Sequence, residues 1–301
     1  MKNYLVKYKY YLSLHGVIFL WGFTGILGRL ITIPSSAIVW LRMLIALLGL
    51  LAFMLATRRS FKTTHRNRLK FLITGVITAG HWLFFFEALK VSNVSIALTT
   101  LASTSLFVAF MEPFFFKRKL ILYELFLGFG TLIGLAIIFR AETIYALGII
   151  YALIAAVLAA LFGTLNGVFV KHDRPTLITV YEMLGGVIAI SVYYLMAGNF
   201  QSFALPTAMD WVWLIILGLI CTSFAFVVSI EVMKELSPFT VSMSINMEPI
   251  YAIIFALIIF QEEEMMSPLF YLGAAMVMGM IFINGYFKRK AKLKSEKVPV
   301  H

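Results

Sequence analysis

Residues 35–56 read SSAIVWLRMLIALLGLLAFMLA, and Arg42 is the one charged side chain in this stretch. An α-helix rises about 1.5 Å per residue, so roughly 20 consecutive apolar residues cross the hydrocarbon core of a bilayer. A strand that crosses a bilayer alternates apolar and polar residues over about ten positions, whereas this stretch is continuously apolar. It therefore predicts a transmembrane helix.

Nine further apolar runs of similar length lie along the chain, and only short connections separate them. The sequence has 301 residues, of which 61% are hydrophobic and 13% are charged, against about 25% charged residues in typical soluble domains. We therefore expect an all-α integral membrane fold with ten transmembrane helices. The nine further runs are 10–31, 69–89, 91–116, 121–140, 144–170, 176–197, 208–233, 239–260 and 267–287.

The positive charge is arranged as a topology signal. The net charge is +11, and 21 of the 25 Lys and Arg residues fall on one side if the N-terminus is placed inside. Cytoplasmic loops of membrane proteins carry this excess of positive charge. The pattern predicts a multi-pass protein of the cell (plasma) membrane with both termini in the cytoplasm. It indicates the lipid bilayer, and no nucleic acid, as the partner of the charged segments.

The two halves of the sequence are weakly similar. At an offset of 144 residues Glu87-Ala-Leu-Lys90 aligns with Glu231-Val-Met-Lys234, and at an offset of 140 Arg42-Met-Leu aligns with Glu182-Met-Leu. Because each half holds five helices, an odd number, the second half enters the membrane with inverted orientation. Inverted repeats of this kind build alternating-access transporters with a site at the repeat interface.

We therefore expect three segments. Residues 1–143 form the first five-helix repeat, residues 144–287 form the second, inverted repeat, and residues 288–301 form a basic cytoplasmic tail.

Several short motifs, in their order and spacing, resemble the ten-helix EamA-type members of the drug/metabolite transporter superfamily. The resemblance covers nearly the whole chain and implies two EamA-like repeats around a central cavity that transport small organic metabolites, often outward. The first half departs from the pattern, because Ser105 stands where the second half has Pro249. The motifs are Leu20-Trp21-Gly22, Arg42-Met-Leu-Ile-Ala46, Glu87-Ala-Leu-Lys90, Asn246-Met-Glu248-Pro249 and Phe260-Gln-Glu262.

Three charged residues are candidates for gating or coupling, because a charge near the bilayer centre costs about 2.5–3.5 kcal/mol on insertion scales. Arg42 is either an anion-binding or gating group, or a structural cation bonded to helix-end carbonyls. Glu182 aligns with Arg42 and is either a proton carrier or a structural acid. Glu248 precedes Pro249, which bends a helix and frees carbonyls for a ligand; the alternative is a role in helix packing.

Uncharged polar and aromatic residues recur at mid-depth in the first, third, fourth, sixth, eighth and ninth runs. We expect these runs to surround a substrate-binding cavity, although tight helix packing would satisfy the same groups. The fifth and tenth runs are almost wholly apolar at that depth, so they are expected to face lipid or a second copy of the chain in a homodimer. The cavity candidates are Trp21, His81, Trp82, Ser103, Asn166 and Asn246.

The leading hypothesis is a secondary transporter that exports small organic metabolites, amino-acid-like or related compounds, by alternating access. The alternatives are an intramembrane enzyme and a non-transporting membrane scaffold. The sequence holds no His-Glu-x-x-His, Gly-x-Ser-x-Gly or phosphate-loop motif, and its single cysteine, Cys221, leaves no thiolate cluster within one chain. We therefore expect a protein that is not an enzyme, with no catalytic residues, no metal and no cofactor.

The topology is testable with reporter fusions. Fusions near positions 64 and 295 should report from the cytoplasm and a fusion near position 202 from outside, because the clusters of Lys and Arg flank only the first two positions. A reporter at 202 that is active only in the cytoplasm would contradict the ten-helix arrangement.

Overall fold

The computed structural model describes residues 2–117, 119, 121–196, 205–261 and 265–296. All regular structure in these residues is helical. In chain order the elements are α1 (Lys2–Leu30), α2 (Ser35–Ala56), α3 (His65–Val91), α4 (Val94–Leu101), α5 (Thr104–Phe116), α6 (Leu122–Ala141), the 3₁₀-helix η1 (Thr143–Tyr145), α7 (Ala146–Phe169), α8 (Pro175–Met196), α9 (Ala208–Ile215), the π-helix η3 (Ile216–Phe224), α10 (Ala225–Val232), α11 (Pro238–Ile245), α12 (Glu248–Phe260) and α13 (Pro268–Glu296).

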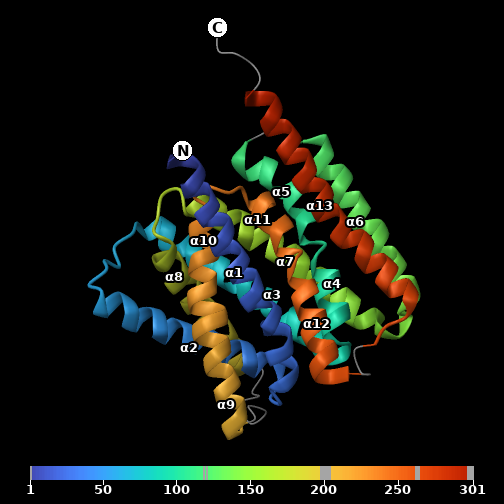
Figure 1. The fold of residues 1–301 in the computed structure, drawn as a ribbon. Helices are drawn as coiled ribbons and strands as arrows, with labels where there is room; N and C mark the ends of the chain where they lie inside the picture. Colours follow the sequence, from blue (N-terminus) through green and yellow to red (C-terminus); the bar gives the residue numbers. More distant parts are fainter. Residues whose placement is uncertain (1, 118, 120, 197–204, 262–264, 297–301) are drawn as a thin grey trace.

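These helices confirm the all-α membrane fold. Within the described residues, nine helical spans are long and apolar enough to cross a membrane, and the tenth run corresponds to α13. The start of α1 and the end of α13 lie at the same end of the bundle (Figure 1), as an even number of crossings requires. Position 202 and the last residues of the tail, 297–301, lie outside the described residues.

Three of the ten spans are interrupted helices. Helices α4 and α5 make the fourth run, α9, η3 and α10 make the eighth, and α11 and α12 make the ninth. The break in the ninth run falls three residues before Pro249, which sits in the first turn of α12. The sequence contains no proline at the equivalent break in the fourth run, so that break was not predicted.

The repeat relation appears in the helix boundaries. Helix α8 has the bounds of α2 shifted by 140 residues, and α11–α12 has the bounds of α4–α5 shifted by 144 residues. Contacts between helices follow the same relation. Helix α3 packs against α7 and α8, while α10 packs against α1 and η3 packs against α2.

The remaining major contacts between helices follow the same repeat relation. Helix α5 packs against α7 and α12 against α1, while α2 pairs with α8 and α6 with α13. Exchanging the two halves thus maps each contact onto another, as a two-fold relation requires. The inverted orientation in the membrane and the segment boundaries after residues 143 and 287 stay predictions.

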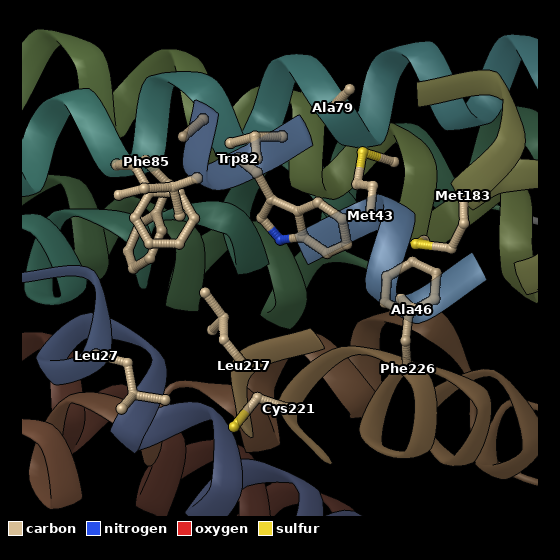
Figure 2. Packing of buried hydrophobic residues seen from close by; sticks show 14 of the residues in the cluster. Leu27, Met43, Ala46, Ala79, Trp82, Phe85, Met183, Leu217, Cys221 and Phe226 are labelled. Carbon is tan, nitrogen blue, oxygen red and sulfur yellow. The ribbon is translucent and has the colours of Figure 1, made fainter. Parts of the chain in front are cut away.

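The two halves share one interlocked core, because most of these contacts run between halves rather than within one. Figure 2 shows Met43 and Trp82 of the first half in the same buried cluster as Met183, Leu217 and Phe226 of the second. The outer pair α6 and α13 runs side by side at one edge of the bundle (Figure 1).

Glycines allow the closest helix crossings. A Cβ atom added at Gly75 would lie 2.0 Å from the carbonyl oxygen of Glu182, and one added at Gly218 would lie 3.2 Å from that of Arg42. These two crossings are equivalent under the repeat relation. Small residues at helix interfaces bring backbones together in membranes, where lipid supplies no hydrophobic drive for association. The two crossings therefore fix how deep within the helix bundle Arg42 and Glu182 lie.

The crossing at Gly75 should tolerate no side chain. Gly75→Ala is expected to lower the free energy of unfolding by about 1–3 kcal/mol or more through overpacking. Gly16→Ala is the matched control, since a Cβ there meets nothing within 4 Å in a helix of the same kind. Thermal unfolding of both purified variants in detergent tests this, and equal melting temperatures would contradict the close crossing.

Candidate functional site

A cavity of about 120 Å³ lies among the interrupted helices. Its walls come from the six predicted spans, now α1, α3, α4–α5, α7, α10 and α11–α12, and also from α2 through Arg42. Most of the lining is apolar. The polar and aromatic lining side chains are Trp21, Thr24, Arg42, His81, Trp82, Phe85, Thr104, Phe162, Asn166, Phe226, Ser229, Ser242, Asn246 and Glu248.

The structure brings most of the predicted site residues together. Five of the six cavity candidates line the cavity: Trp21, His81, Trp82, Asn166 and Asn246. Ser103 does not line it. Its side chain is 1% exposed and sits in the turn between α4 and α5, while its neighbours Ala102 and Thr104 line the cavity instead.

Two of the three charged candidates line the cavity, and the third does not. Arg42 and Glu248 line the cavity, although they are only 1% and 6% exposed. Glu182 is fully buried and does not line it. The repeat relation therefore places a cation at the cavity in the first half and a sequestered acid at the equivalent position of the second.

The cavity lies nearer to one end of the bundle, which we call the lysine end. This end carries Lys171 and Lys234, and the Nζ atom of Lys171 donates a hydrogen bond of 2.7 Å to the carbonyl oxygen of Lys234. The lining residues of α7, α10 and α11 lie in the parts of these helices that lead to the lysine end, such as Asn166, Met233 and Pro238. By the charge rule this end is predicted to be cytoplasmic.

The opposite end is held together by hydrogen bonds between elements distant in sequence. The backbone N–H and the hydroxyl of Thr32 each donate 2.8 Å bonds to the carboxylate of Asp210. The Nζ atom of Lys90 donates to the carbonyl oxygen of Ile33. The α1–α2 connection is thereby tied to the start of α9 and to the end of α3.

The two broken helices meet at their breaks. The Nδ2 atom of Asn246, at the end of α11, donates a 3.2 Å hydrogen bond to the hydroxyl of Ser105 in the first turn of α5. The hydroxyls of Thr104 and Ser105 donate to the carbonyl oxygens of Leu101 and Ala102 at 2.7 and 3.1 Å. Side chains thus add hydrogen bonds to carbonyls at the break in the fourth span, where the regular α-helical ladder is interrupted.

The π-helix η3 positions Arg42. Its wider turn lets the Thr222 hydroxyl donate a 2.7 Å hydrogen bond to the carbonyl oxygen five residues earlier, that of Leu217. With its proton used, the Thr222 oxygen accepts from Nε and Nη2 of Arg42 at 3.1 and 2.7 Å. One hydroxyl therefore fixes one edge of the guanidinium group.

Two aromatic rings pack against the same guanidinium group. Its central carbon lies 3.9 Å from the centroid of the Trp82 ring and 5.4 Å from that of Phe86. Cation–π contacts of this kind contribute up to about 2 kcal/mol when the cation is desolvated. The Nη1 atom is buried and has no hydrogen-bond partner among the described residues.

Glu182 is connected to the cavity through Asn166. The Nδ2 atom of Asn166 donates a 3.3 Å hydrogen bond to Oε2 of Glu182, while Oε1 of Glu182 and Oδ1 of Asn166 have no partner among the described residues. Asn166 lines the cavity and Glu182 lies behind it. The pair is therefore a buried polar contact that is only partly satisfied, which is costly in a medium of low dielectric constant.

His81 is held in one tautomer. Its Nδ1 atom lies 2.8 Å from the carbonyl oxygen of Ala155. Because a carbonyl oxygen can only accept, Nδ1 carries the proton and Nε2 is left as an acceptor in the neutral ring. The ring also stacks on Phe85 and meets Phe162 edge-on, with centroids 6.2 and 5.3 Å apart.

The cavity lies on the axis of the repeat relation. In several equivalent pairs, both members line it: Trp21 and Phe162, Leu98 and Ser242, Leu101 and Ile245, Ala102 and Asn246, and Thr104 and Glu248. The members from the first half are mainly small or apolar, whereas the second half contributes the amide of Asn246 and the acid of Glu248. The site is therefore symmetric in position and asymmetric in chemistry.

Sequence reasoning missed Thr222, Thr24 and Ser229. Thr222 follows Cys221 in an apolar run, and no sequence motif distinguishes it from an ordinary helix threonine. Its role depends on the π-helix, which has no recognisable signature in the sequence. Trp21, predicted as a cavity residue, also donates a 3.0 Å hydrogen bond from Nε1 to the carbonyl oxygen of Cys221 in the same π-helix.

A polytopic helical membrane protein with two related halves and a cavity between them has the architecture of a solute transporter. The family model described as the EamA-like transporter family matches this chain twice, over residues 9–140 and 146–286. The chain belongs to the EamA-like transporter family, within the drug/metabolite transporter superfamily.

Two individual proteins are similar to it. "Uncharacterized transporter YxxF" of Bacillus subtilis (strain 168) is 25% identical over 244 residues, which cover 78% of this chain and 76% of the relative. A solved structure described only as "Crystal structure of protein" aligns with a TM-score of 0.71 at 16% identity, covering 94% of this chain and 98% of the other. The second likeness concerns the fold alone.

The contact between Asn166 and Glu182 makes a prediction for stability. Asn166→Leu should lower the free energy of unfolding by about 1–3 kcal/mol, because the buried Glu182 carboxyl loses its donor. In a Glu182→Leu background the same change should cost less. Thermal unfolding of the two single variants and the double variant measures the coupling. Strict additivity would show that the two side chains do not interact.

Proposed function

We propose that this protein is a secondary transporter that exports small organic metabolites, amino-acid-like or related compounds, across the plasma membrane by alternating access. The observation that carries the proposal is the cavity at the helix breaks, displaced toward the lysine end while the opposite end is tied by Thr32, Asp210 and Lys90. A cavity that lies toward one end of the bundle, with the other end tied together, is the arrangement expected of one half of an alternating-access cycle.

The wall chemistry suits a small organic solute. Ligand pockets are mostly apolar with a few placed polar groups, and this cavity combines apolar and aromatic walls with Arg42, Asn246 and Glu248. Polar groups at this depth are expensive unless water or a ligand meets them. Their retention around one cavity supports transport rather than passive packing.

The direction of transport follows from the predicted topology. If the lysine end is cytoplasmic, the cavity lies toward the cytoplasm, which supports export. Family membership favours transport over the alternatives of an intramembrane enzyme or a non-transporting scaffold.

The experiment is a metabolite-efflux screen that compares cells with and without the protein. At least one small organic metabolite should accumulate outside only when the protein is present. Trp82→Ala, His81→Ala and Asn246→Ala should each lower the initial efflux rate of that metabolite about tenfold, because each removes a wall group or a link between the breaks.

The matched control is Phe53→Ala, which removes an exposed aromatic ring on α2 outside the cavity and should leave efflux unchanged. Expression and thermal stability of every variant are measured alongside. Parental efflux in all three folded cavity variants would contradict the site. A screen in which no metabolite depends on the protein would contradict transport.

A further inference from the structure

We propose that Arg42 binds a carboxylate of the transported solute, which makes organic monocarboxylates the substrate class. This inference rests on the proposed function, because it names the chemistry of a ligand for the same cavity. Its carrying observation is a buried guanidinium at the cavity wall that uses only one of its two hydrogen-bonding edges.

The free edge has the geometry that a carboxylate needs. Nε and Nη2 of Arg42 both donate to the single oxygen of Thr222, so the Nε–Nη2 edge is occupied. Nη1 has no partner among the described residues, and Nη2 keeps a second hydrogen. The Nη1–Nη2 edge therefore offers two parallel N–H bonds, which match the two oxygens of a carboxylate.

The charge of Arg42 also lacks a counter-ion. Over the described part of the chain, no carboxylate forms an ion pair with Arg42, and its hydrogen-bond acceptor Thr222 is neutral. A buried cation without an anion is strongly unfavourable. An anion arriving with the solute removes that penalty, while the Trp82 ring keeps the guanidinium plane in place.

The number of cations at the cavity argues for one negative charge on the ligand. Arg42 is the one Lys or Arg side chain among the residues described as lining this cavity, so a second negative charge on the solute would meet no second cation. Glu248 lines the same cavity and supplies no positive charge in either protonation state. Phosphate and dicarboxylates are therefore disfavoured relative to monocarboxylates.

The experiment measures thermal unfolding of the purified full-length protein with acetate, butyrate, phenylacetate and leucine. The amide of each compound serves as an isostere in which an uncharged carboxamide replaces the carboxylate, and inorganic phosphate, at a pH above its second ionisation, serves as a dianionic probe. Ligands that bind only the folded state raise the melting temperature. At least one carboxylate should raise it, and its amide and phosphate should not.

Arg42→Met separates binding from a structural role. It should abolish the carboxylate-specific shift and raise the melting temperature of the ligand-free protein, because it removes an uncompensated buried charge while keeping a long side chain. A structural cation predicts the reverse, a lower melting temperature without ligand. In efflux assays Arg42→Met should raise the KM of the metabolite about tenfold or more, the loss expected for charge-assisted hydrogen bonds.

The matched control is Arg59→Met. Arg59 also lies over an aromatic ring, 4.9 Å from the Phe53 centroid, and also donates to a threonine, Thr176 at 3.3 Å, yet it does not line the cavity. It should keep the carboxylate shift. The proposal is overturned if no carboxylate shifts the wild-type protein, if the amides shift it equally, or if Arg42→Met retains the shift.

The two proposals fail separately. A carboxylate shift that depends on Arg42, with no metabolite found in the efflux screen, would contradict transport and leave the binding site standing. Efflux with an unchanged KM in Arg42→Met would overturn the carboxylate site and leave transport standing.

Discussion

Lipid offers no hydrogen bonds, so every backbone amide and carbonyl within the bilayer needs a partner from the protein itself. Continuous helices meet this requirement alone, and most of the chain follows that solution. The fourth and ninth spans do not, because α4 and α11 end near mid-length. Their breaks persist because Thr104, Ser105 and Asn246 supply hydroxyls and an amide where the backbone ladder is interrupted. The cavity lies at these breaks, where side chains supply hydrogen bonds that the helical backbone supplies elsewhere.

The same requirement governs the charged side chains. Arg42 is satisfied on one edge by Thr222 and against the face of Trp82, and Glu182 on one oxygen by Asn166. Neither is satisfied completely by described residues. Natural proteins keep such imperfect sites mainly where function needs them. The asymmetry between the two equivalent positions gives the halves different chemistry within one shared geometry.

The sequence predicted the fold well because continuous apolar runs and the alternation of positive charge are strong, local signals. Five of the six cavity candidates line the cavity, because polar and aromatic groups at mid-depth of apolar runs are rare enough to stand out, and their role in substrate binding stays a prediction. Ser103 does not line the cavity, because it sits in the turn between α4 and α5, and a break without proline leaves no mark in the sequence. Sequence reasoning failed for Thr222 because the role of that residue depends on a π-helix and on a partner 180 residues away. Helix phase at a break, rather than residue type, decides which hydroxyl reaches the cavity.

That separation between Arg42 and Thr222 has a consequence for biosynthesis. Chains are synthesised at about 5–20 residues per second, so a contact spanning 180 residues forms roughly 10–35 seconds after Arg42 leaves the ribosome. The crossing of Gly75 with Glu182 must wait as well, because the partner helix does not yet exist. During this interval the first half sits in the membrane with an unpaired cation and open helix faces. The nascent chain therefore depends on the insertion machinery or on interfacial water to shelter Arg42 until the second half arrives.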